Sequence, residues 1–318
     1  MFKGKQKVLH NKYTLTIGKN GQLLVRSSKA YLYLLCPLIV FIAFLFYPLV
    51  MVLRTSFYEK YVYITSKGSG FGLASYKFVL NDPVFKIALK NTGILMLVAL
   101  PATIILSLAF ALLINSIKKL QGLFQTLYFL PYVTSTIAVG SVFYCLFHTD
   151  VGYMNWFLGL FGADKVAWLT DPTKVIWALT IFCIWNGLAF KIVIFLAGLQ
   201  KIDKQVYKAA KMDGAKPTKV LFHITLPLLS PTIWMVLIIS VIYVARTYNE
   251  VYALFTSVNN PAAGSGNCAI TVAYYIYYMF FVRGQVNYAA AAAMMFLVFI
   301  MALTIVQRLV SRKFVYYA

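Results

Sequence analysis

Residue types that commonly carry chemistry are sparse in this chain and lie far apart in its sequence. The three histidines, His10, His148 and His223, fall in three separate segments, so they predict neither a metal cluster nor a nucleophile paired with a base. The cysteines show no disulfide framework and no metal-ligand spacing: Cys36, Cys145, Cys183 and Cys268. The sequence therefore argues against an enzyme and against a bound metal.

The chain also has no glycine-rich phosphate loop. Gly4-Lys5 and Gly18-Lys19 lack both the earlier glycine and the following hydroxyl residue of the Gly-x-x-x-x-Gly-Lys-Ser/Thr pattern. If the activity of this protein uses ATP, another chain must bind the nucleotide.

One polar stretch, residues 200–231, separates two long apolar segments and is predicted to form two short helices. The first helix has a small, apolar side and a basic side. The apolar side is formed by Val206, Ala209, Ala210 and Met212, and the basic side by Lys204, Lys208 and Lys211.

The two helices are expected to meet at Asp213-Gly214, because glycine accepts the left-handed backbone conformation that helix ends often need. Pro217 suits the first turn of the second helix, and Pro227 and Pro231 are expected to end it. The stretch therefore predicts a helix–turn–helix that presses a small apolar surface into another protein.

This helix–turn–helix resembles the coupling motif of ATP-binding-cassette importer permeases. The resemblance is carried by Ala209-Ala210, Asp213-Gly214-Ala215, Ile224, Leu226-Pro227 and Pro231. In that family the two helices sit in a cleft of the ATPase subunit, and the motif usually opens with a glutamate, where this chain has Lys208. The resemblance implies a dimeric ATPase partner that holds ATP and magnesium, with no cofactor on this chain. An ordinary cytoplasmic helical hairpin is the alternative.

Composition places the whole chain in a membrane. Of its 318 residues, 61% are hydrophobic and 12% are charged, and the mean hydropathy is +0.78. The net charge of +21 is unevenly distributed: seven basic residues lie in 1–29, two at Lys118-Lys119, six in 200–229 and three after Gln307. These segments are loops on the same side of six spans, so the charge indicates a cytoplasmic excess of Lys and Arg rather than a nucleic-acid surface.

The predicted fold is all-α, a polytopic membrane bundle of about six helices with a cytoplasmic two-helix coupling motif. The spans are expected at about 30–53, 90–114, 123–147, 175–199, 232–254 and 286–307.

Residues 1–29 form a basic cytoplasmic tail, in which a small hairpin over 13–25 and a disordered segment both remain open. Residues 30–318 form one permease domain, which includes the coupling loop 200–231. Tyr153, Trp156 and Trp168 in the outer loop 148–173 are expected near lipid head groups.

The resemblance covers roughly residues 30–318 and implies a permease subunit of a carbohydrate importer in a bacterial inner membrane, with both termini cytoplasmic. It further implies a homologous second permease and an extracytoplasmic substrate-binding protein. Related sugar permeases place substrate-contacting residues in the fourth and fifth spans, at positions that match Asn186, Gly187, Phe190, Tyr248 and Asn249. Packing and an interhelical hydrogen bond are the alternative roles for these residues.

Lys191 lies near the middle of the fourth predicted span, where a charged side chain must face protein or water. Gly187 and Gly198 share its helix face, which points that face into the bundle. Two interpretations remain open. A buried acidic partner, with Glu250 the nearest candidate, or backbone carbonyls would hold Lys191, or Lys191 and Arg246 would make the substrate path electropositive and suited to an acidic sugar.

Two rival functions fit part of the pattern. An importer for another polar solute would carry the same coupling motif. A membrane scaffold that recruits an ATPase would also carry it, but would not need prolines within its spans at Pro48, Pro101 and Pro131. The absence of a clear internal repeat argues against a repeat-built secondary transporter.

Overall fold

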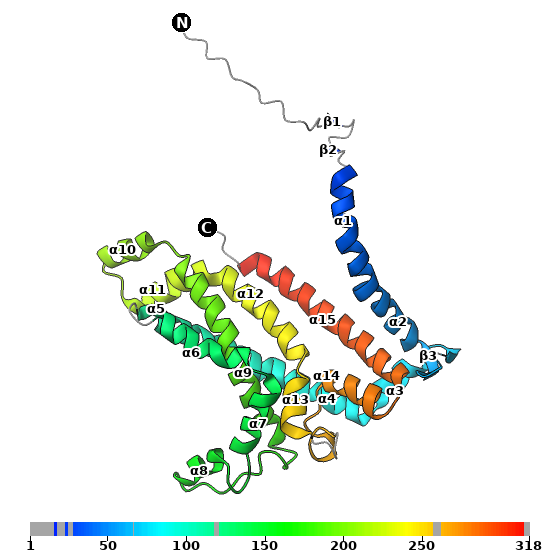
Figure 1. Ribbon diagram of the computed structural model, residues 1–318. Helices are drawn as coiled ribbons and strands as arrows, with labels where there is room; N and C mark the ends of the chain where they lie inside the picture. Colours follow the sequence, from blue (N-terminus) through cyan, green and yellow to red (C-terminus); the bar gives the residue numbers. More distant parts are fainter. Residues whose placement is uncertain are drawn as a thin grey trace. The chain divides into compact units, whose positions relative to one another are not determined.

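The computed structural model describes residues 16–17, 23–24, 28–65, 67–117, 121–256 and 262–314. The chain divides into two compact units, Met1–Val52 and Leu53–Ala318. Helices make up most of the described chain (Figure 1). The predicted class, an all-α polytopic membrane bundle, is confirmed.

The first unit holds a short hairpin and most of the first apolar helix. Strands β1 (Thr16–Ile17) and β2 (Leu23–Leu24) pair antiparallel, as the hairpin interpretation requires, and the other residues of 13–25 lie outside the described residues. The helix begins as α1 (Ser28–Phe41) and passes through the π-helical turn η1 (Ile42–Phe46) into α2 (Tyr47–Ser56), which enters the second unit. The helix over Tyr33–Ser56 contains an 18-residue stretch with a mean hydropathy of 2.6, which fits the predicted first span.

Among the described residues, the second unit has four more helices that are long and apolar enough to cross a membrane: Pro83–Ser116, Val175–Gln200, Pro217–Ala245 and Val286–Arg312. The first of these consists of α4 (Pro83–Ile94), the π-helical turn η2 (Leu95–Ala99) and α5 (Leu100–Ser116). The second is α9 (Val175–Gln200), and the last lies within α15 (Val286–Phe314). Three of them match predicted spans with small shifts of their boundaries, and Pro217–Ala245 overlaps the predicted fifth span only in part.

The third predicted span, 123–147, is not one straight helix. It consists of α6 (Gln121–Val133) and α7 (Thr136–Leu146), which are bent by 94° relative to each other. Pro131 lies near the end of α6 and Ser135 is extended, with φ −60° and ψ 127°. A proline removes one helix hydrogen bond and clashes with the preceding turn, which accounts for a break at this position.

The fifth predicted span, 232–254, also differs. The second coupling helix does not end at Pro227 or Pro231. It runs without interruption from α11 (Pro217–Val220) through the π-helical turn η3 (Leu221–Thr225) into α12 (Leu226–Ala245). The helix breaks only at residues 246–248, and α13 (Asn249–Phe255) follows.

π-Helical turns explain how these helices tolerate proline. Pro48, Pro101 and Pro227 each occupy the second helical position after a π-helical turn, namely after η1, η2 and η3. A π turn replaces i→i−4 bonding by i→i−5 bonding, so the proline that follows it leaves fewer backbone groups unpaired. A sequence rule that treats every proline as a helix end therefore fails here.

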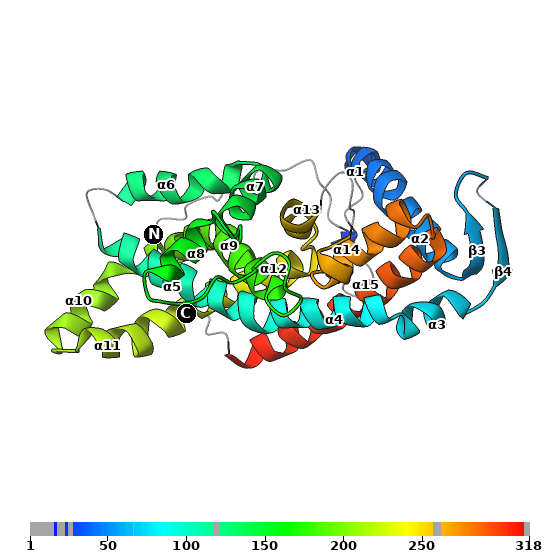
Figure 2. The same ribbon diagram turned by 90° about the horizontal axis from the view of Figure 1, so that it is seen from below.

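The segment between the first two spans is structured. β3 (Tyr58–Val62) and β4 (Lys67–Phe71) form an antiparallel hairpin, which lies at the end of the second unit opposite α10 (Lys204–Met212) and α11 (Figure 2). α3 (Ala74–Asn81) follows it. Asp82 then caps α4, because its Oδ1 accepts from the Val84 N–H at 2.9 Å and its Oδ2 accepts from the Tyr275 hydroxyl at 2.7 Å.

The core of the second unit forms around α9. Near its start, α9 packs with α7 and α13, and all three share one buried cluster with α14 (Val272–Tyr277), which continues into the π-helical turn η5 (Tyr278–Val282). Near its end, α9 packs side by side with α5, through buried residues such as Ala111 and Phe195. Figure 1 shows α10 and the end of α15 at one end of this unit, and α8 (Tyr153–Gly159) at the other.

Candidate functional site

The turn between the two predicted coupling helices, α10 and α11, is built by local hydrogen bonds. α10 (Lys204–Met212) begins at Asp203, whose carboxylate accepts from the Gln205 N–H at 2.9 Å. At its end, the N–H of Gly214 donates to Lys211 and the N–H of Ala215 donates to Ala210. This pair of hydrogen bonds forms the Schellman motif, which requires the left-handed φ of +68° at Gly214.

The second coupling helix is tied to the first by one polar contact. Tyr207 of α10 lies with its hydroxyl 3.2 Å from the Thr225 hydroxyl of η3. Thr225 is buried, and its hydroxyl also donates to the Val220 carbonyl. The glycine turn and this contact together set the angle between α10 and α11.

The hairpin leaves an apolar surface exposed. Met212 is 85% exposed and Phe222 is 62% exposed, and Val206 and Ala209 are also exposed. Ala210 differs from the prediction: it is buried within this chain, so it belongs to the base of the hairpin and not to its outer face. Of the other predicted coupling residues, Lys208, Asp213 and Gly214 are exposed, and Ala215, Ile224, Leu226 and Pro227 are partly buried.

A second candidate site lies inside the bundle, where three polar side chains from α9, α12 and α13 meet. The amide nitrogen of Asn186 donates to the Tyr243 hydroxyl at 2.8 Å and to Glu250 Oε1 at 3.3 Å. The Tyr243 hydroxyl donates to the same carboxylate oxygen at 2.9 Å. Glu250 is only 5% exposed, so both donors serve a buried carboxylate.

Lys191 lies beside this cluster. Its ammonium group is 5.3 Å from the centre of the Tyr243 ring, which is a cation–π distance. Gly187 makes the room for it, since a Cβ at that position would come within 2.8 Å of Lys191 Nζ. Lys191 is buried, as expected of a face turned into the bundle.

The expected ion pair between Lys191 and Glu250 is not formed. Within the described part of the chain, the one carboxylate oxygen within 4.0 Å of a basic side chain belongs to Asp150, which faces Lys165. Tyr243 stands between the two charges instead: its ring faces Lys191 and its hydroxyl binds Glu250. The buried charges are thus linked through an aromatic side chain.

The remaining predicted path residues lie in other surroundings. Phe190 stacks on Tyr132 of α6, with ring centres 5.5 Å apart. Tyr248 joins a cluster of aromatic rings with Tyr274 and Tyr277. Arg246 and Asn249 are exposed at the break between α12 and α13. The structure therefore brings Asn186, Gly187 and Lys191 together and leaves the other four outside their cluster.

Sequence reasoning missed Tyr243. It lies in an apolar helix rich in isoleucine and valine, and a single tyrosine there carries no local signal. Its partner Glu250 follows seven residues later, a two-turn spacing, but the helix break between them removes the periodicity that would have indicated contact.

The apolar spans, the β3–β4 hairpin and the helices α10 and α11 define a multi-pass membrane protein whose buried polar cluster lies within a helical bundle. Residues 103–316 match the family described as "Binding-protein-dependent transport system inner membrane component". The chain belongs to this family.

Two curated relatives resemble most of the chain. The arabinooligosaccharides transport system permease protein AraP of Bacillus subtilis (strain 168) is 32% identical over 291 residues, which cover 91% of this chain and 90% of AraP. The lactose transport system permease protein LacF of Rhizobium radiobacter is 32% identical over 277 residues, which cover 85% of this chain and 89% of LacF.

Among solved structures, the fold resembles a chain in the crystal structure of a bacterial ABC transporter involved in the import of the acidic polysaccharide alginate. The TM-score is 0.74 at 24% identity, and the match covers 90% of this chain and 95% of the other. This similarity establishes the shared fold.

Proposed function

We propose that this chain is one permease subunit of an ATP-driven importer for a sugar or oligosaccharide, in a bacterial inner membrane. The similarity to AraP over nine-tenths of both chains carries the proposal. LacF, a second sugar permease, supports the same substrate class. The family description supports dependence on a binding protein, and the solved transporter with a similar fold was also crystallised with an alginate pentasaccharide-bound periplasmic protein.

In this proposal, α10 and α11 dock into a dimeric ATPase that holds the ATP and magnesium, and a homologous permease supplies the other half of the path. The exposed Met212 and Phe222 support docking, because they present apolar surface that the rest of the described chain leaves uncovered. Hydrolysis takes place on the partner, and this chain transmits the movement.

The unbroken helix from Pro217 to Ala245 gives that movement a direct route. Its 29 residues span about 44 Å at about 1.5 Å per residue. A push on the coupling hairpin would displace the far end of α12, where the helix breaks beside Arg246 and where Glu250 joins the buried cluster. Switching between inward- and outward-facing states would then centre on this break.

An acidic saccharide is the form of substrate that the charges favour. Arg246 is exposed at the break, where a passing carboxylate could reach it. Lys191 contributes less than the sequence suggested, because Glu250 lies close by on the other side of Tyr243 and offsets its charge. The alginate transporter with a similar fold handles an acidic polymer, which is compatible with this form.

Substrate-stimulated ATP hydrolysis tests the proposal. The chain, co-expressed with its partner permease, ATPase and binding protein, is reconstituted into lipid vesicles and given neutral oligosaccharides, uronic-acid oligosaccharides, amino acids or glycerophosphodiesters. We expect stimulation by a saccharide. Stimulation by amino acids or phosphodiesters alone would show an importer for another polar solute, and no stimulation or uptake with any compound would favour a scaffold.

Two substitutions separate the contributions of Arg246 and Lys191 to substrate choice. Arg246→Gln should lower uptake of acidic saccharides more than uptake of neutral ones, and the difference should shrink as salt is raised. Lys191→Met should affect both classes alike. An equal loss of uptake for acidic and neutral saccharides in Arg246→Gln would show that this charge does not discriminate between them.

A further inference from the structure

The helix α8 and the turn that follows it present a continuous apolar stripe to their surroundings. The stripe residues recur at the i, i+3, i+4, i+7 and i+8 spacing of one helix face. Their exposed fractions are large: Tyr153 70%, Trp156 64%, Phe157 51%, Leu160 63% and Phe161 74%. No described element of this chain covers the stripe.

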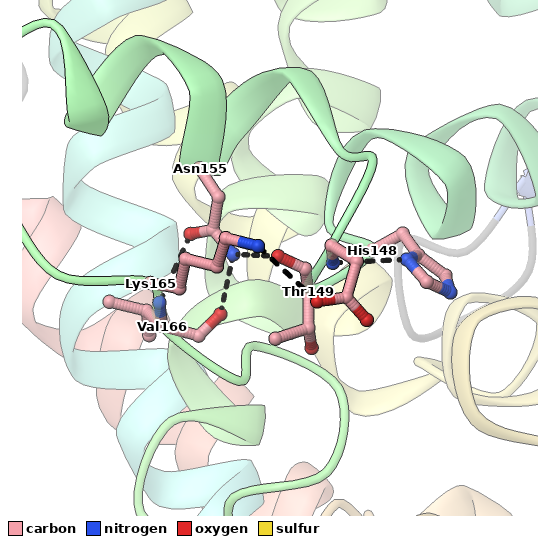
Figure 3. Close-up of polar contacts among 6 residues, drawn as sticks. His148, Thr149, Asn155, Lys165 and Val166 are labelled. Atoms are coloured by element: carbon pink, nitrogen blue, oxygen red, sulfur yellow. Dashed lines mark hydrogen bonds and ion pairs between the residues drawn. The ribbon is translucent and has the colours of Figure 1, made fainter.

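The loop over 148–173 anchors α8 through the side of the helix that faces away from the stripe. Asn155, the one residue of α8 that is buried, donates through its amide to the Thr149 and Val166 carbonyls at 2.9 and 2.8 Å. Its carbonyl accepts from the Val166 N–H and the Trp168 indole. Figure 3 shows Asn155 bridging the two arms of the loop, beside His148 and Lys165. A side chain with all these bonds fixes which face of α8 points outward.

Trp168 shows that only part of the loop is turned outward. The sequence predicted this residue near lipid head groups, together with Tyr153 and Trp156. Instead, its ring centre lies 5.8 Å from that of Phe147 and its indole N–H donates to Asn155, so Trp168 packs inside the loop and helps to hold it in place. The aromatic residues of α8 remain exposed, and they do so as a single face.

Charge is absent from this face. Residues 153–163 contain no Lys, Arg, Asp or Glu. The nearest flanking charges are Asp164 and Asp150, and Asp150 is paired with Lys165 at 3.4 Å. A protein-docking surface usually has a polar rim around its apolar centre, whereas aromatic and aliphatic side chains without charges suit the boundary between head groups and acyl chains.

We propose that α8 lies in the interface of the bilayer with its stripe inserted among the lipids. The position in the chain supports this occupant: α8 follows α7 and precedes α9, so the loop begins and ends at membrane-crossing helices. Because the stripe is uncharged, zwitterionic lipid suffices and salt should not weaken the contact. The inference does not depend on which solute is transported.

An environment-sensitive label tests the contact. The native cysteines are replaced by serine, and Phe157→Cys is labelled with the fluorophore NBD in the assembled transporter in phosphatidylcholine nanodiscs. Asp164→Cys, in the same loop but off the stripe, is the matched control. Phe161→Cys is a second stripe position in case Phe157→Cys does not assemble, with assembly checked by size-exclusion elution.

For the stripe positions we expect blue-shifted emission, strong quenching by doxyl-labelled lipid and little quenching by aqueous iodide. The Asp164 label should show the reverse, and neither pattern should change at high salt. Iodide quenching of the stripe labels equal to that of the control would overturn the proposal. So would a stripe label shielded from both quenchers, which would place it against the partner permease, or one shielded only after the binding protein is added.

Discussion

At the residue scale, Gly214 is the position where a single backbone angle decides the shape of the coupling hairpin. Its φ of +68° is needed for the bonds from Gly214 and Ala215 to the last turn of α10. A Cβ at this position would meet nothing within 4 Å in the described part of the chain, so crowding is not the constraint there. The constraint is the left-handed conformation itself, which β-branched residues adopt poorly.

We predict that Gly214→Val leaves the protein in the membrane but uncouples it from the ATPase. The left-handed φ costs a non-glycine residue about 1–2 kcal/mol, so α10 and α11 lose their relative angle. Co-purification of the ATPase and substrate-stimulated ATP turnover measure the effect.

Gly162→Val is the matched control, because Gly162 also has a positive φ, +76°, and open space around it, but lies in the loop after α8. Normal coupling in Gly214→Val, or an equal loss in both variants, would contradict a role of the turn in docking.

Glu250 is the second residue whose role can be isolated. We predict that Glu250→Ala lowers stability by about 1–3 kcal/mol, because it removes the buried acceptor of the Asn186 amide and the Tyr243 hydroxyl, which are themselves partly buried. Glu250→Gln keeps an acceptor oxygen and should lose less. Thermal unfolding in detergent measures both, with Glu59→Ala as the exposed-carboxylate control. The cluster would not be a structural unit if Glu250→Ala unfolded at the wild-type temperature.

At the element scale, the contact between α7 and α13 is set by two small residues. A Cβ at Gly140 would lie only 2.2 Å from the Cβ of Ala253, so the two helices can approach this closely only with glycine present. α13 carries Glu250, and this contact therefore holds the carboxylate in place within the cluster.

Gly140→Leu should displace α13 and destabilise the protein by about 1–3 kcal/mol, the usual range for overpacking. Transport should fall with it, because Glu250 moves. Gly93→Leu provides the comparison: it is also a helix glycine, but no described atom lies within 4 Å of its Cβ position, so its stability should stay equal or rise. Thermal unfolding of the two variants side by side decides the matter, and equal losses would show that close approach at Gly140 is unimportant.

At the scale of the whole molecule, α10 and α8 lie at opposite ends of the second unit, which fits a hairpin on the cytoplasmic side and an outer loop on the other (Figure 1). We predict that Thr218→Cys reacts with a membrane-impermeant maleimide only in inside-out vesicles, and Ser265→Cys only in right-side-out vesicles. Both side chains are exposed, so access is limited by the membrane alone. Labelling of both positions from the same side would overturn the orientation.

The sequence by itself determined the features that depend on neighbours within a few residues. Composition and hydropathy indicated which stretches of the chain are apolar enough to span a bilayer, because a span requires about 20 apolar residues whatever they pack against. The turn at Asp213-Gly214 was equally predictable, since its hydrogen bonds join residues at most five positions apart.

Tertiary structure decided the rest. Pro131 accompanies a 94° bend, whereas Pro227 lies in an unbroken helix, because the surrounding π turn and packing determine the outcome. The meeting of Asn186 with Glu250 joins residues 64 positions apart and depends on how α9, α12 and α13 pack. Hydropathy places a helix in the membrane but does not select its neighbours, and those neighbours create the buried cluster.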